Sequence, residues 1–168
     1  MLSDTWLSDD AIAALRAQLP PAPRPQGGYV PAVAHGALVQ TAGMTPRVDG
    51  TLQYVGQVGA ELTVEQARAA AAIAAENALS AALAAAHAAG PSEPTYGWRF
   101  DRVVHLRVYV NAVAGFGEHT AVADGASERL RTLLGDRAAA ARVAVGVPSL
   151  PQGAAVEVEL TCARVGGR

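Results

Sequence analysis

Hydrophobic and polar residues alternate most clearly in the last third of the chain. Successive side chains of a strand point to opposite faces of a sheet, so residues 141–147 divide into a valine face and a face that carries Arg142. Residues 156–162 divide in the same way into an apolar face and a face with Glu157 and Glu159. If the two strands are neighbours with their apolar faces together, the arginine and both glutamates share the polar face. A solvated outer face with a surface ion pair would produce the same alternation.

A third alternating stretch, residues 103–110, has one face that is too mixed for open solvent and too polar for a monomer core. The residues expected to point inward are Val104, Leu106, Val108 and Val110, and those on the opposite face are Val103, His105, Arg107 and Tyr109. We expect this mixed face to form a subunit interface.

Two helices are predicted between the strands. The first begins at Thr63, which forms a capping box with Gln66, and continues as an alanine-rich segment to Gly90. Most of its polar residues, among them Asn77 and Ser80, fall within an arc of about 120°. The remaining expected elements are a hairpin over residues 29–44 that turns at His35 and Gly36, a helix over 116–135, and the three strands described above. This order predicts an α+β fold, in which a mixed sheet is covered on one face by two helices.

The first 28 residues are predicted to be a leader rather than a separate domain. Ser8 can cap a short helix that carries Ile12 and Leu15 on one side, and a linker with four prolines follows over residues 19–28. We expect residues 1–28 to pack on a single domain formed by residues 29–168.

Composition excludes several classes of function. The net charge of −2 and the aromatic content of 5% disfavour a nucleic-acid partner. All 13 basic residues are arginine, so Schiff-base chemistry and a Walker lysine are excluded. The single cysteine, Cys162, permits neither an internal disulfide nor a cysteine cluster for zinc. The N-terminus lacks a signal-peptide pattern, and the apolar run over residues 67–75 is too short to span a membrane before the polar residues Glu76 and Asn77. We therefore expect a cytoplasmic protein.

Several motifs resemble the RidA family, also called YjgF or L-PSP. The resemblance rests on Arg142-x-x-Val145, on Leu150-Pro151-x-Gly153-Ala154-x-Val156-Glu157-Val158-Glu159, on Gly28-Tyr29-x-x-Ala32-Val33 and on Thr41-x-Gly43-x-x-Pro46. The leader and the segment over residues 56–65 are similar to a longer branch of this family, some members of which carry the label endoribonuclease L-PSP. The resemblance implies a chorismate-mutase-like fold and a homotrimer whose sheets form a central barrel.

The resemblance also implies a site between subunits that binds a small carboxylated metabolite, such as a 2-imino or 2-enamino acid. Arg142 would bind the carboxylate and Glu157 would position or deprotonate a water that attacks the imine carbon. The substrate-binding positions implied are Tyr29, Gly43, Phe116, Thr120 and Ala144. No metal and no organic cofactor is implied.

Three positions depart from the pattern of the family's deaminases. Ala42, Ala144 and Thr120 stand where many active members have serine, cysteine and asparagine. Two functions therefore remain open: an enzyme that hydrolyses imine or enamine intermediates, and a non-catalytic trimer that binds a small carboxylate. The balance of charge disfavours ribonuclease activity.

Overall fold

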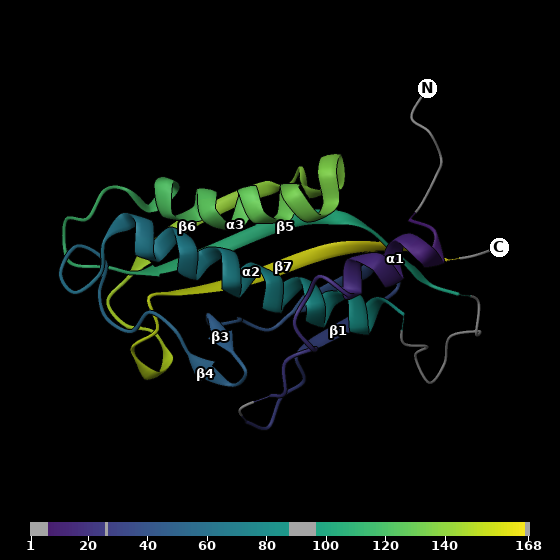
Figure 1. Cartoon of the computed structure of the whole chain (residues 1–168), viewed down its shortest axis with the longest axis horizontal. Helices are drawn as coiled ribbons and strands as arrows, with labels where there is room; N and C mark the ends of the chain where they lie inside the picture. The colour runs from purple at the N-terminus through teal and green to yellow at the C-terminus, as the bar shows by residue number, and fades with distance from the viewer. Residues whose placement is uncertain (1–6, 26, 88–96, 167–168) are drawn as a thin grey trace.

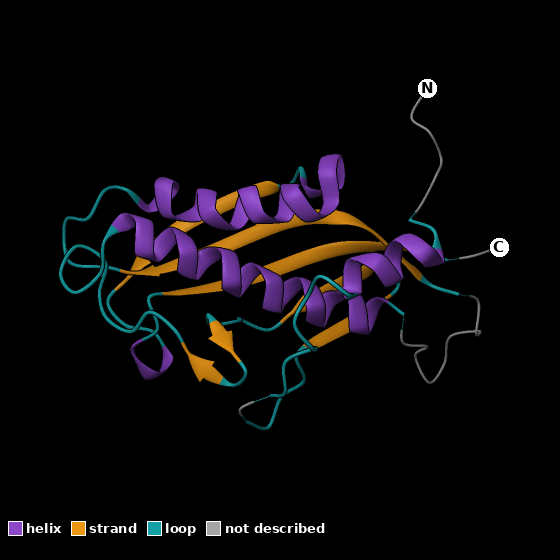
Figure 2. Cartoon of the chain, viewed as in Figure 1, coloured by secondary structure: helices purple, strands orange, loops and turns teal. Residues whose placement is uncertain are grey.

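A five-stranded mixed sheet forms the centre of the protein, and two long helices cover one of its faces (Figures 1 and 2). The structure is a computed structural model and describes residues 7–25, 27–87 and 97–166. The strands lie in the order β1 (Ala32–His35), β2 (Leu38–Thr41), β7 (Val156–Val165), β5 (Arg99–Asn111) and β6 (Ala141–Val147). β5 and β6 are parallel, and the other neighbours are antiparallel. The predicted α+β class is confirmed.

The two covering helices are α2 (Val64–Ala86) and α3 (His119–Leu134). The capping box of α2 is present, because Gln66 N donates to Thr63 Oγ1 at 3.2 Å and Thr63 N donates to Gln66 Oε1 at 2.8 Å. The predicted end of this helix at Gly90 lies outside the described residues. α3 begins three residues later than predicted and ends at Gly135, as predicted. The remaining short elements are α1 (Asp9–Arg16), the hairpin of β3 (Arg47–Val48) and β4 (Thr51–Leu52), and the 3-10 turns η1 (Gly135–Ala138) and η2 (Pro151–Gly153).

Small residues let the helices approach the sheet and each other closely. The α2 residues that face the sheet are mainly fully buried alanines. Where α3 crosses α2, a Cβ on Gly125 would lie 2.2 Å from the carbonyl oxygen of Arg68, so only glycine fits there. Among the described helices α2 is long and apolar enough to cross a membrane, but 67% of its most apolar 18-residue stretch is buried inside the protein. It is therefore placed as a core helix of this fold.

The predicted inward face of β5 is confirmed from Leu106 onward and is wrong at its start. Val103 is fully buried and Val104 is 41% exposed, the reverse of the expected arrangement. The pairing of β5 with β7 shifts register between Val103 and His105. An extra residue in one strand reverses the faces on one side of it, which explains the exchange.

Residues 7–25 of the leader pack against α2. Ile12 and Leu15 of α1 belong to the hydrophobic core, and the Arg16 side chain donates to the carbonyl of Leu83 at 3.1 Å. Ser80 Oγ donates to the carbonyl of Pro20 at 2.7 Å and so fixes the start of the linker. The polar arc of α2 therefore contacts other parts of the protein, with Ser80 bound to the linker, Asn77 to the start of β3 and Glu76 to Arg129 of α3.

Candidate functional site

Arg142 and Glu157 lie on opposite faces of the sheet. β5 separates β6 from β7, and Leu106 of β5 is paired with Arg142 on one side and with Leu160 on the other. Because partners in one row of a sheet share a face, Arg142 lies on the helix-covered face with these buried leucines. Glu157 is paired through Tyr109 with Val145, on the uncovered face.

The prediction that Arg142 shares a face with the two glutamates is therefore wrong. The valines of β6 lie on the uncovered face, where Val143 is 39% and Val145 is 42% exposed. Alternation identified the two faces of β6 correctly but assigned the wrong one to the core. The reason is that α3 supplies polar partners for Arg142 on the covered face.

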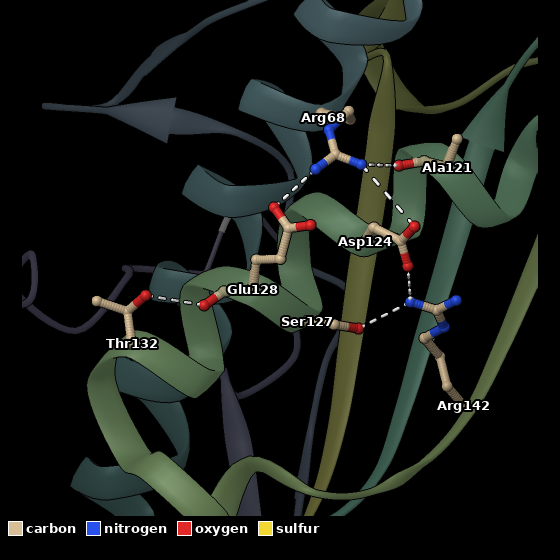
Figure 3. A network of polar contacts seen from close by, with 7 residues as sticks. All are labelled: Arg68, Ala121, Asp124, Ser127, Glu128, Thr132 and Arg142. Atoms are coloured by element: carbon tan, nitrogen blue, oxygen red, sulfur yellow. Dashed lines mark hydrogen bonds and ion pairs between the residues drawn. The ribbon is translucent and has the colours of Figure 1, made fainter.

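Arg142 belongs to a network of charges between α2, α3 and β6 (Figure 3). Its Nη1 donates to Asp124 Oδ1 at 2.8 Å and to Ser127 Oγ at 2.9 Å. The other oxygen of Asp124 lies 3.9 Å from Arg68 Nη1, and Arg68 Nη2 donates to Glu128 at 2.6 Å. We call Arg68, Asp124, Ser127, Glu128 and Arg142 the Arg142 cluster.

The partners of Arg142 all contact one nitrogen of its guanidinium. Nε and Nη2 make no hydrogen bond within the described parts of the chain, and the side chain is 24% exposed. The Nη1 group of the guanidinium is therefore held by α3, while Nε and Nη2 can bind a carboxylate through two parallel hydrogen bonds.

The other predicted residues on this face extend along β6 and the start of α3. Ala144 is half-buried and follows Arg142 on the same face, and Thr120 is exposed one helical turn before Asp124 on the same stripe of α3. Phe116 packs edge-on against His119, with ring centroids 5.1 Å apart. His119 in turn lies over Gly146, where a Cβ would come within 2.3 Å of its Nε2.

Glu157 lines a pocket of about 270 Å³ that is separate from the Arg142 cluster. Its lining residues are Tyr29, Ala42, Gly43, Thr45, Arg47, Pro151, Gln152 and Glu157, and we call it the Glu157 pocket. Gly43 is held beside β7 by two hydrogen bonds between its neighbour Met44 and Val158. A Cβ on Gly43 would lie 1.6 Å from Glu157 Oε1, so the carboxylate occupies the space that a side chain would need.

Burial and the neighbouring Glu159 raise the pKa of Glu157 above its ordinary value of 4.5. Glu159 itself is paired with Arg107 of β5 at 3.5 Å. A carboxyl group with a raised pKa both accepts and returns protons more readily near neutral pH. The raised pKa makes the Glu157 carboxylate a stronger proton acceptor than an ordinary glutamate.

The structure thus brings together two separate groups of predicted residues. Tyr29, Gly43 and Glu157 line one pocket, whereas Arg142, Ala144, Phe116 and Thr120 lie on β6 and around the start of α3. Sequence reasoning missed Asp124 and Ser127, although their spacing of three on the predicted helix places them on one face. It also missed Arg47, and no motif pointed to it. No group of three His, Cys, Asp or Glu that could hold a metal ion occurs among residues 7–25, 27–87 and 97–166.

Comparisons with known proteins agree with this fold. The family described as Endoribonuclease L-PSP matches residues 20–164. Protein TCP17 of Trypanosoma cruzi is 39% identical over 143 residues, which are 84% of each chain. The crystal structure of Atu1372 from Agrobacterium tumefaciens, a protein described as having unknown function, is 32% identical with a TM-score of 0.76 and covers 92% of each chain. E. coli TdcF with bound serine is 18% identical with a TM-score of 0.56, covers 86% of this chain and 94% of that chain, and supports the fold alone.

The fold therefore defines an α+β protein of the YjgF type. By its match over residues 20–164, the chain belongs to the Endoribonuclease L-PSP family, the family also called RidA or YjgF.

Proposed function

We propose that the protein is a homotrimer that binds a small carboxylated metabolite between subunits, with the Arg142 cluster of one subunit opposite the Glu157 pocket of the next. The observation that carries this proposal is the separation of Arg142 and Glu157 within one chain. They lie on opposite faces and two strands apart, at a spacing of about 4.8 Å per strand. A single site can contain both only if a second subunit supplies one of them.

The uncovered face of the sheet supports the assembly. It combines the half-buried polar residues His105, Arg107 and Tyr109 with the exposed valines of β6. A sheet face with this mixture is suited to contact another copy of the same sheet, because apolar area is buried while the polar groups pair across the interface. The serine bound to E. coli TdcF supports a small polar ligand for this type of protein.

The proposed reaction is hydrolysis of a 2-imino acid. The free edge of Arg142 binds the substrate carboxylate, and Glu157 accepts a proton from water as the water oxygen bonds to the imine carbon. Addition of water to the protonated imine gives a neutral carbinolamine, and Glu157 returns its proton to the nitrogen of this intermediate. Ammonia then leaves as the hydroxyl group loses its proton to solvent and becomes the carbonyl. One water is consumed, one ammonia and one 2-keto acid are formed, and no redox partner or cofactor enters the balance.

A second candidate is a binding protein without catalysis. Two features favour it. Ala42 in the Glu157 pocket and Ala144 beside Arg142 carry no polar group, and Thr120 is exposed without a described partner. Arg142 also already donates a hydrogen bond to Asp124 through Nη1, so fewer of its donors remain for a ligand. Both candidates are proposed to act in the cytoplasm.

Release of ammonia from 2-aminoacrylate generated in situ separates the two candidates. The enzyme releases ammonia faster than the uncatalysed reaction, and Glu157→Gln removes that acceleration because an amide cannot accept the proton of water. Arg131→Gln is the matched control, since Arg131 is exposed in the last turn of α3. Equal rates with and without protein would leave the binding function. Equal ligand affinity of the wild type and Arg142→Ala in calorimetry would refute both.

A further inference from the structure

A second cavity of about 350 Å³ lies between the linker and the β3–β4 hairpin. Its volume is within the range of small-molecule sites, about 300–1,000 Å³. Linker residues from Pro20 to Arg24 form one wall, and Arg47 with the hairpin forms the other. The cavity borders the Glu157 pocket, with which it shares Tyr29, Gly43, Thr45 and Arg47, but Glu157 and Arg142 do not line it.

One helix face holds both walls of this cavity in place. Ser80 binds the linker through the carbonyl of Pro20, as described above. Asn77, one turn earlier on α2, donates through Nδ2 to the carbonyls of Thr45 (3.1 Å) and Arg47 (3.0 Å), where β3 begins. The spacing between linker and hairpin is therefore fixed by two buried side chains of α2, so the cavity is a built feature of the fold.

The polar groups of the cavity favour an anion. Arg47 donates from its two terminal nitrogens to Gly50 O at 2.8 Å and to Gln152 Oε1 at 2.6 Å, both uncharged acceptors. In the regions that the structure describes, neither Arg47 nor Arg24 lies within 4.0 Å of a carboxylate oxygen. Asp49 is the acidic residue of the lining, so the two arginines leave an excess of positive charge.

The rest of the wall is apolar. Pro21 and Pro23 of the linker, Met44 and Tyr29 line the same space. Asn77 is 5% exposed and also lines the cavity. Because its Nδ2 is committed to two carbonyls, Oδ1 is the amide atom left to accept a hydrogen bond. The site therefore offers cationic groups at one part, a hydrocarbon surface at another and the amide group of Asn77.

From these contacts we propose that the linker cavity binds a small carboxylate with an apolar or aromatic side chain. The two arginines bind the carboxylate, and the prolines and Tyr29 contact the hydrocarbon part. Rigid proline walls lose little conformational entropy on binding. This site is independent of Arg142 and does not require the proposed trimer.

The test uses phenylacetate as the probe and the full chain labelled with [13C-methyl]methionine. The chain contains two methionines, and Met44 is the one in the lining, so its methyl resonance reports binding inside the cavity. Phenylacetate is expected to shift this resonance with saturation. Acetate, which lacks the ring, and 2-phenylethanol, which lacks the charge, are expected to bind about tenfold more weakly.

Variants locate the ligand. Arg24→Gln is expected to weaken phenylacetate binding about three- to tenfold without changing the fold, because Arg24 makes no hydrogen bond among the described residues. Arg47→Gln is expected to weaken it further. Arg131→Gln is expected to leave it unchanged, and Arg142→Ala is expected to leave the saturating shift of the Met44 resonance unchanged. Undiminished binding to Arg24→Gln and Arg47→Gln would overturn the proposal. Loss of the Met44 shift in Arg142→Ala would also overturn it, and would place the ligand in the subunit site of the proposed function instead.

Discussion

Gly43→Ala tests whether the Glu157 carboxylate occupies the position described. The added Cβ would lie 1.6 Å from Oε1, 2.5 Å from Cδ and 2.9 Å from Cγ of Glu157. Real Cβ contacts are essentially never shorter than 3.0 Å, so the glutamate must rotate away. The φ angle of Gly43 is not in the left-handed region, so alanine fits the backbone there. The whole cost of the substitution therefore falls on the glutamate side chain.

The cost in stability is modest, because the clash is with the far end of a flexible side chain. Overpacking a core costs about 1–3 kcal/mol, and the lower end applies here, since the rotated carboxylate moves toward water. A loss of about 1 kcal/mol lowers the melting temperature by roughly 2–4 °C in a domain of this size. The loss in function is larger than this, because the proposed base leaves the pocket.

A double-mutant cycle isolates the contact. Gly43→Ala, Glu157→Ala and the double variant are compared by thermal unfolding. Gly117→Ala is the matched control, since nothing lies within 4 Å of its added Cβ. Gly43→Ala is expected to cost about 1 kcal/mol in the wild type and close to nothing when Glu157 is alanine, which gives a coupling energy of about 1 kcal/mol. An equal cost in both backgrounds would show that the carboxylate does not lie against Gly43.

Three further predictions concern the charges and the leader. Asp124→Asn keeps an acceptor beside Arg142 and removes a competing charge, so calorimetry should show a small carboxylate ligand binding up to about fivefold more tightly than to the wild type. Asp124→Ala loses the contact that orients the guanidinium, so the same ligand should bind more weakly. The opposite order of affinities would contradict this. The pKa of Glu157 is raised in the folded state, so its contribution to the free energy of unfolding is complete below pH 4.5 and is lost as the pH rises through the folded value. The melting temperature of Glu157→Gln should therefore increase relative to that of the wild type between pH 4 and 7. A difference in melting temperature that does not depend on pH would refute this. Ile12→Ala should cost about 2 kcal/mol of unfolding free energy because the side chain is buried against the core, while affinity for the ligand of Arg142 stays unchanged; loss of that affinity would place the leader in the site.

Local sequence signals predicted the elements of this fold well. The capping box at Thr63 fixed the start of α2 to the residue, and the alternation over residues 156–162 identified the buried face of β7. The hairpin over residues 29–44 turns at Gly36, where a φ of 55° favours glycine. Each of these signals depends on neighbours a few residues apart, so it can be read without knowledge of the tertiary structure.

The position of the site could not be predicted in the same way. Placing Arg142 beside Glu157 required β6 to neighbour β7, but the parallel pairing of β5 with β6 puts β5 between them. The face of β6 that enters the core was also ambiguous, because valines at an edge strand can face a partner subunit as well as the interior. Strand order and oligomeric contact are long-range properties, and alternation within one strand carries no information on either.

The Arg142 cluster also limits the kind of ligand that the proposed subunit site can take. Its two guanidinium groups are balanced by the carboxylates of Asp124 and Glu128, so it attracts an approaching anion weakly through net charge. Recognition then depends on the geometry of the free Nε and Nη2 edge, where a hydrogen bond to a charged group contributes about 1.5–3 kcal/mol. A planar carboxylate matches this edge with two bonds, and a spherical anion does not. The site should therefore select carboxylates by shape and bind them with modest affinity, and tighter binding requires additional contacts from the Glu157 pocket of the neighbouring subunit.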